Sequence, residues 1–100
     1  MFGKGDIVKI VDEGAVYPDH IEMAIRLKAT KWKETKYNSR KFYRYNNKIG
    51  IIKNHGIDVS KGVTIYLIYI DSMDTEILIE GFGFIEASFQ EIVRRVREIA

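Results

Sequence analysis

Apolar and polar residues alternate near the start of the chain, in the stretch GKGDIVKIVDEG. Isoleucines and valines between positions 7 and 11 are interleaved with Asp6, Lys9 and Asp12, and Gly14 follows. Alternation with a period of two is typical of a half-buried β-strand, and glycine commonly ends such a run. The pattern therefore predicts a short first strand.

A helical period follows in YPDHIEMAIRLKAT and predicts one short helix over residues 18–28. Pro18 suits a first helical turn, and Asp19 with Glu22 has the spacing of a capping box. The residues expected on the inner face, with a lysine at its edge, are Ile21, Ala24, Ile25 and Lys28, and Met23 and Leu27 widen this stripe.

Runs of β-branched and aromatic residues in the second half predict the rest of a sheet. KIGIIKN has strand character around residues 49–52, and VTIYLIYI, residues 63–70, is the strongest strand signal because it is apolar on both faces. DSMDT has the length of a hairpin turn, so EILIEGFGFI is expected to pair with the strand before it. Gly81 and Gly83 are expected to bend that strand near its end.

The C-terminal stretch ASFQEIVRRVREIA is open to two interpretations. A helix would gather one apolar stripe from Phe89, Ile92, Val93, Val96 and Ile99. Alternatively, residues 88–91 form a tight turn and residues 92–97 form a closing strand.

Short strands, one early helix and glycine-punctuated loops predict an all-β (or β-rich α+β) fold, a small and strongly bent barrel. A length of 100 residues suits a single domain, residues 1–100. The residues expected in its core are Ile7, Ile10, Ile25, Ile51, Ile65, Leu67, Ile77, Ile79 and Phe89.

The composition narrows the classes of protein to consider. The chain is 46% hydrophobic and 30% charged, which is typical of a globular domain. It has no cysteine, so neither a disulfide nor a thiolate metal site can hold the fold. No apolar run reaches the roughly 20 residues of a membrane-spanning helix, and MFGKGDIVKI lacks the pattern of a signal peptide. The expected location is the cytoplasm, with no membrane partner.

Charge is distributed unevenly along the chain. Residues 28–53 hold nine lysines and arginines and one glutamate, a local charge of +8, whereas the whole chain carries +2. The remainder therefore carries −6, and this asymmetry favours a charged partner surface. Within the basic aromatic segment, residues 28–48, the candidate partner-binding residues are Lys31, Trp32, Lys33, Lys36, Tyr37, Arg40, Lys41, Tyr43 and Arg44.

Three interpretations of the basic aromatic segment stay open. Cations neutralise phosphates, and aromatic rings stack on unpaired bases for about 1–3 kcal/mol each, so the segment could bind RNA or single-stranded DNA. Trp, Tyr and Arg also dominate the hot spots of protein interfaces, which favours a protein partner. In the third interpretation Trp32 pins the helix to the barrel and residues 41–45 form an edge strand with its cations in solvent. That edge would also permit a homodimer.

Few residues offer catalytic chemistry. His20 and His55 lie in different predicted elements, the four serines lack a nucleophile-elbow motif, and GFGF lacks the context of a phosphate loop. The densest carboxylates lie on the predicted hairpin: Asp71, Asp74, Glu76 and Glu80. A divalent cation held there would suit a metal-dependent nuclease, but capping of the turn and outward strand positions explain these side chains better. We expect no enzyme, no cofactor and no metal.

Several stretches resemble SH3-like barrels. GDIVKIVDEG is similar to their opening strand, where a Gly-Asp pair precedes an alternating run. KIGIIKN and IYLIYIDSMDTEILIEGFGFIEASFQEI resemble the middle and end of such barrels, including the Gly-Ile step of KOW-type modules. The resemblance implies a five-stranded SH3-like barrel with the helix inserted after strand 1. It also implies a closing turn followed by a last strand, and so favours the turn-and-strand interpretation of the C-terminal stretch. The residues that would form this turn and strand are Glu86, Ala87, Ser88, Phe89 and Ile92.

YPDHIEMAIRLKATKW, with the extended segment after it, resembles small uncharacterised barrel proteins encoded by bacteriophages. This resemblance implies a protein that binds and modulates a host macromolecule in the host cytoplasm, for example as an inhibitor of a defence component. We therefore expect a non-enzymatic protein-binding module whose contacts centre on residues 31–44. A KOW-like nucleic-acid-binding module is the alternative, and a metal-dependent nuclease comes third.

Overall fold

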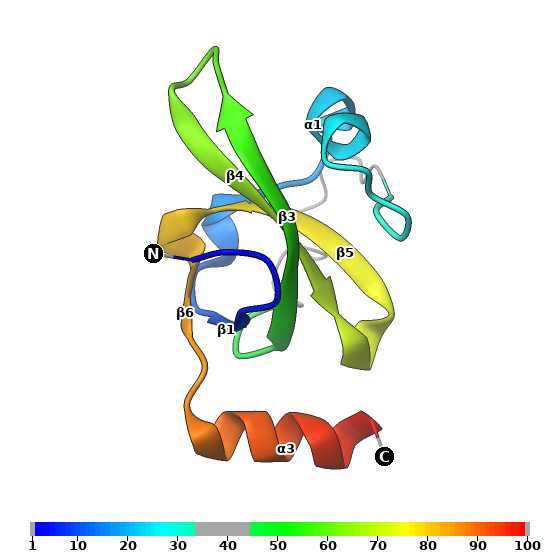
Figure 1. Cartoon of the computed structure of the whole chain (residues 1–100), viewed down its shortest axis with the longest axis vertical. Helices are drawn as coiled ribbons and strands as arrows, with labels where there is room; N and C mark the ends of the chain where they lie inside the picture. Colours follow the sequence, from blue (N-terminus) through cyan, green and yellow to red (C-terminus); the bar gives the residue numbers. More distant parts are fainter. Residues whose placement is uncertain (1, 34–44, 100) are drawn as a thin grey trace.

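One sheet dominates the computed structural model, which describes residues 2–33 and 45–99 (Figure 1). Within these ranges the strands are β1 (Ile7–Ile10), β2 (Val16–Tyr17), β3 (Ile49–Asp58), β4 (Val63–Ile70), β5 (Thr75–Glu80) and β6 (Phe84–Glu86). The helices of the same ranges are α1 (Ile21–Arg26), α3 (Phe89–Ile99) and the short 3-10 helices η1 (Glu13–Ala15), η2 (Asp71–Met73) and η3 (Gly81–Gly83). None of these helices is long and apolar enough to cross a membrane.

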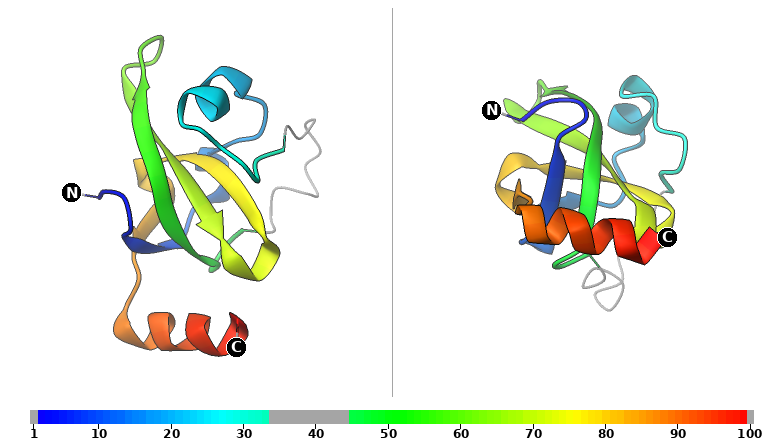
Figure 2. Two further views of the ribbon diagram at one scale, coloured as in Figure 1. Left: turned by 45° about the vertical axis from the view of Figure 1, so that its right-hand side comes forward. Right: turned by 60° about the horizontal axis from the view of Figure 1, so that its bottom comes forward.

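The sheet is antiparallel and has the strand order β2-β5-β4-β3-β1-β6. β3, β4 and β5 form consecutive hairpins, and η3 turns the chain so that β6 pairs with β1. A bulge between Ile52 and Asn54 bends the long strand β3, and the sheet curls into a half-barrel (Figure 1 and Figure 2). The predicted fold class, a small β-rich barrel with an early short helix, is confirmed. The described residues contain six strands rather than five, because Val16–Tyr17 pairs with β5.

Strands β4 and β5 are buried on both faces, as the apolar run VTIYLIYI predicts for β4. Successive strand residues point to opposite faces of a sheet. One face encloses a barrel core made of Val8, Ile10, Ala15, Ile52, Ile68, Ile70, Ile77, Ile79 and Phe84. The other face packs against α1 in a second cluster made of Met23, Ala24, Leu27, Ile65, Leu67 and Leu78.

Most of the predicted core residues are buried, but not all. The confirmed ones are Ile10, Ile65, Leu67, Ile77 and Ile79. Ile7 and Ile51 are half-buried. Ile25 and Phe89 are 72% and 80% exposed, so their assignment to the core was wrong. Both lie on helices, where the orientation of the apolar stripe depends on how the helix docks.

Helix α1 is shorter than predicted, and only the Met23, Ala24 and Leu27 part of the predicted stripe faces the sheet, whereas Ile21 and Ile25 are exposed. His20 takes the N-cap position, where its Nδ1 accepts a hydrogen bond from the Met23 amide (3.4 Å), so the predicted cap at Asp19 was wrong. Lys28 adopts the left-handed conformation (φ 62°), which ends the helix before that residue. Within these limits Met23 and Leu27 become the deeply buried contacts of the helix.

The C-terminal residues form helix α3, so the favoured closing turn and strand were wrong. Ser88 and Glu91 make a reciprocal capping box. The Ser88 amide donates to Glu91 Oε2 (2.7 Å), and the Glu91 amide donates to Ser88 Oγ (3.2 Å). This S-x-x-E pattern satisfies the first free amides of a helix and so fixes where it begins. The turn and last strand that were predicted for residues 88–97 occur earlier in the chain, as η3 and β6.

Gly83 lets the η3 turn approach the barrel core. A Cβ at this position would lie 2.5 Å from Ile79 Cδ1 and 2.6 Å from Ala15 Cβ. We expect Gly83→Ala to lower the free energy of unfolding by about 1–3 kcal/mol through overpacking, measured by urea denaturation. Gly3→Ala is the matched control, because nothing lies within 4 Å of its Cβ position. Equal losses in the two variants would contradict the packing argument.

Candidate binding surface

The first end of the basic aromatic segment is fastened to β5 by a buried carboxylate. Glu76 is 5% exposed, and its Oε1 accepts hydrogen bonds from the backbone amides of Thr30 (2.7 Å) and Lys31. The Glu76 amide donates in turn to the Lys31 carbonyl (3.4 Å). Hydrogen bonds to a charged acceptor are stronger than neutral ones. Glu76 does not point into solvent, as the sequence suggested, because residues 30–31 cover it.

Trp32 extends this attachment. Its backbone forms an isolated parallel β-bridge with Glu76. Its half-buried ring packs against the cluster that contains Met23 and Leu27. Trp32 thus pins the chain after α1 to the sheet, which is one of the roles predicted for it. The packed part of the ring is unavailable for stacking on a base.

The two lysines that flank Trp32 are exposed, and Lys31 lies beside an acidic turn. Lys31 Nζ is 3.2 Å from Asp74 Oδ2, and the Tyr69 hydroxyl donates to Asp74 Oδ1 (2.7 Å). The Tyr69 hydroxyl, and then the Lys31 ammonium, hold the pKa of Asp74 below its usual value. The surface at this end of the segment therefore carries both signs of charge.

The second end of the segment is held by another buried glutamate. Asp12 caps η1 by accepting from the Gly14 amide (2.9 Å), and this places Glu13 with 3% of its surface exposed. Glu13 Oε1 accepts from the Asn46 amide (2.9 Å), and the Tyr45 amide also bonds this carboxyl group. Burial raises the pKa of Glu13, although the two amides act in the opposite direction.

Buried carboxylates thus hold both ends of the basic aromatic segment, at residues 30–31 and 45–46. Of the predicted site residues, the structure places Lys31, Trp32 and Lys33 together at the first end. The remaining predicted site residues lie outside the described part of the chain: Lys36, Tyr37, Arg40, Lys41, Tyr43 and Arg44.

Two of the carboxylates considered for a metal site have structural partners. Asp74 accepts from the Tyr69 hydroxyl (2.7 Å) and pairs with Lys31, and Glu76 is engaged by residues 30–31. Among residues 2–33 and 45–99, no group of three or more histidines and carboxylates is placed to hold a metal ion. The nuclease interpretation gains no support from this geometry.

A polar cluster that the sequence did not predict surrounds Asp58, a buried residue at the end of β3. Asp58 Oδ1 accepts from the Ser60 hydroxyl (2.7 Å) and amide (3.1 Å), and His20 Nε2 lies 3.3 Å from Oδ2. The Ser60 hydroxyl is the main cause that lowers the pKa of Asp58, and His20 adds to it. Both ring nitrogens of His20 are engaged, since Nδ1 caps α1. The cluster ties α1 to the β3–β4 hairpin, and only the D-x-S spacing at 58–60 could have indicated part of it.

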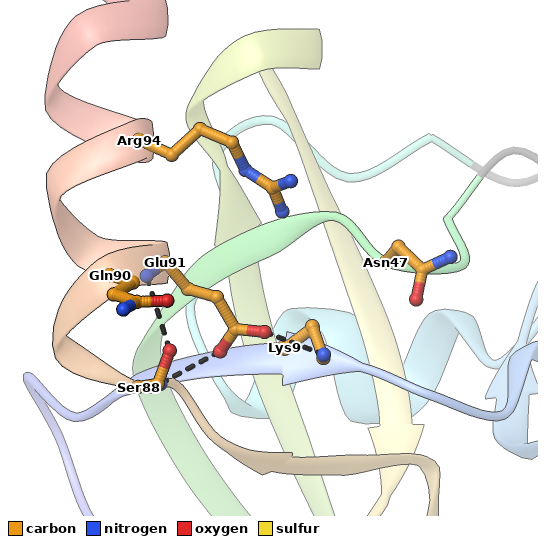
Figure 3. A pocket seen from close by; sticks show the side chains of 6 residues that line it. All are labelled: Lys9, Asn47, Ser88, Gln90, Glu91 and Arg94. Atoms are coloured by element: carbon orange, nitrogen blue, oxygen red, sulfur yellow. Dashed lines mark hydrogen bonds and ion pairs between the residues drawn. The ribbon is translucent and has the colours of Figure 1, made fainter.

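A second polar group that the sequence did not predict lies where α3 begins (Figure 3). Lys9 Nζ of β1 lies 2.5 Å from Glu91 Oε1, so the same glutamate that completes the capping box also binds the sheet. The Lys9 ammonium, helped by the Ser88 amide, lowers the pKa of Glu91 to about 2. The S-x-x-E pattern at 88–91 was the available signal for this arrangement.

Comparison with known proteins yields no relative: no protein-family model, curated protein or solved structure matches the chain. The resemblance to SH3-like, KOW-type and bacteriophage barrels stays a prediction.

Loss of the Glu76 carboxylate should release the first end of the segment. We expect Glu76→Ala to lower the free energy of unfolding by about 3 kcal/mol, because each hydrogen bond to a charged group contributes about 1.5–3 kcal/mol. Hydrogen exchange should show lost protection at the Thr30 and Lys31 amides. Lys31→Met is the control, since it removes only an exposed ion pair and should change stability little. Unchanged protection of the two amides in Glu76→Ala would contradict the anchor.

The Lys9–Glu91 pair makes the docking of α3 depend on pH. Because the pKa of Glu91 is depressed from 4.5 to about 2, its contribution to stability is present above pH 4.5 and is lost as pH falls toward 2. Lys9→Met should move the NMR titration midpoint of the Glu91 carboxyl upward, toward 4.5. Lys4→Met, at an exposed position away from this pair, should leave the midpoint in place. An unchanged titration midpoint of Glu91 in Lys9→Met would contradict the Lys9–Glu91 ion pair.

Proposed function

We propose that the chain is a non-enzymatic binding module that docks onto a protein through the basic aromatic segment, with contacts centred on residues 31–44. The observation that carries the proposal is the pair of buried carboxylates, Glu76 and Glu13, at the two ends of this segment. Burial of a charge is unfavourable unless it is well hydrogen-bonded. Holding a long insertion by both ends is typical of binding loops placed on a rigid scaffold.

A protein partner suits the first end of the segment better than a nucleic acid. Phosphate binding needs unpaired cations, and base stacking needs free rings. Here Lys31 is paired with Asp74, and Trp32 is partly used in packing. Surfaces with both signs of charge and large apolar side chains are typical of protein interfaces.

Helix α1 adds apolar surface next to the same end. Its outward residues Ile21 and Ile25 are 43% and 72% exposed, and the helix leads directly into residues 30–33. Large exposed apolar side chains beside polar ones commonly mark interaction sites. The resemblance to bacteriophage barrels is our reason for choosing a host protein as the partner, with inhibition as the proposed effect.

The experiment begins with capture of a partner from a bacterial host lysate, followed by calorimetry with that partner after purification. We expect Tyr37→Ala/Tyr43→Ala to weaken binding at least tenfold, because aromatic anchors dominate protein interfaces. Lys36→Ala/Arg40→Ala should weaken it less. Lys4→Ala/Lys53→Ala, which removes the same charge outside the proposed contacts, should leave the affinity unchanged.

Two outcomes would contradict this proposal. The first is unchanged affinity of the purified partner for Tyr37→Ala/Tyr43→Ala, which would place the contact elsewhere. The second is binding of labelled single-stranded RNA or DNA with a steep salt dependence that Lys36→Ala/Arg40→Ala reduces. That result would favour the KOW-like nucleic-acid-binding alternative, because counterion release follows the number of phosphate contacts.

A further inference from the structure

An open pocket lies between α3 and the sheet, and Asn47, near the second end of the basic aromatic segment, is one of its lining residues (Figure 3). Its volume is about 530 Å³, within the range of small-molecule sites. Its lining comes from β1, from the residues before β3 and from α3 with its cap: Lys9, Asn47, Ser88, Gln90, Glu91 and Arg94.

Arg94 gives this pocket an available positive charge. The charges of Lys9 and Glu91 compensate each other, since their atoms are 2.5 Å apart. Arg94 is exposed, and within the described residues no hydrogen bond or ion pair engages its guanidinium. Figure 3 shows the guanidinium extended from α3 across the pocket, on the side of Asn47. The described lining therefore has a net charge of +1.

Asn47 presents a side-chain amide from a fixed position. Its backbone is left-handed (φ 65°), and its backbone amide donates to the Ile10 carbonyl (2.8 Å) at the end of β1. The next residue is fixed too, because the Lys48 carbonyl accepts from the Ile10 amide (2.9 Å). The backbone that carries the donor opposite Arg94 is therefore hydrogen-bonded to the end of β1.

The amides at the start of α3 do not supply this site. The Ser88 and Glu91 amides are used in the capping box, and the Ile92 amide donates to the Ser88 carbonyl (3.0 Å). The available donors are instead the guanidinium of Arg94 and the side-chain amides of Asn47 and Gln90.

We propose that this pocket binds a small molecule bearing a single carboxylate group, with Arg94 as its charged partner and the amides of Asn47 and Gln90 as further donors. The planar guanidinium matches a carboxylate through two parallel hydrogen bonds. One negative charge balances the net +1 of the lining. A phosphate dianion exceeds that charge, because the Lys9–Glu91 pair adds none.

The test is NMR titration of the full chain with benzoate at constant ionic strength, with neutral benzamide as a probe of the same shape. We expect benzoate to shift the side-chain signals of Arg94, Asn47 and Gln90 saturably, with a millimolar Kd, and benzamide to leave them in place. The affinity should be constant between pH 5 and 8, because Glu91, with a pKa of about 2, stays ionised there.

Arg94→Gln should weaken benzoate binding at least tenfold, whereas Arg97→Gln should not change it. Arg97 is an exposed arginine of the same helix that does not line the pocket, so it matches the loss of charge. Unchanged α3 backbone signals would show that Arg94→Gln leaves the helix folded. Equal shifts with benzamide, equal effects of the two variants, or tighter binding of inorganic phosphate than of benzoate would each overturn the proposal. None of these results depends on residues 31–44, where the contacts of the proposed protein-binding surface are centred.

Discussion

Burial of two glutamates under distant backbone segments is the constraint on which the candidate surface depends. Glu76 of β5 and Glu13 of η1 each lose most of their contact with water, and each accepts backbone amides, although Glu13 Oε2 has no hydrogen-bond partner among the described residues and burial raises the pKa of Glu13. Without those amides a buried carboxylate would be strongly destabilising. Residues 30–31 and 45–46 must therefore stay on the barrel for the rest of the sheet to remain as it is. The same hydrogen bonds to Glu76 and Glu13 therefore stabilise the fold and hold the two ends of the basic aromatic segment.

The double burial of β4 and β5 explains how one sheet can serve both as a barrel wall and as a support. Ile77 and Ile79 fill the barrel, while Leu78 supports α1 from the other side. Because α1 is fixed on that outer face, Trp32 can pack against the same cluster directly after it. The polar ties of the cluster around Asp58 hold α1 to the β3–β4 hairpin as well. The candidate surface is thus attached through apolar packing and hydrogen bonds together.

Helix α3 shows how much could be predicted locally and how much could not. Its apolar spacing fits a helix, yet the same short run also fits a turn and a strand, because brief apolar patterns are shared by both periods. The capping pattern at 88–91 resolves the choice and is visible in the sequence. The bond between Lys9 and Glu91 is not visible, because 82 positions separate the two residues in the chain. The pocket beside Arg94 lies where that bond joins α3 to β1.

The amino-acid sequence by itself determined the strand-rich class and the hairpin of β4 and β5, because alternation and two-sided apolarity are properties of neighbouring residues. It also determined that the positive charge is concentrated between Lys28 and Lys53. Only the tertiary structure decided which side of α1 faces the sheet and that Glu13 and Glu76 are buried beneath segments 33 and 45–46 positions away. The local sequence around a glutamate in a strand or turn is the same whether its carboxylate is solvated or accepts a hydrogen bond from a distant amide. The hydrogen-bond partner of the carboxylate is determined only by the tertiary fold.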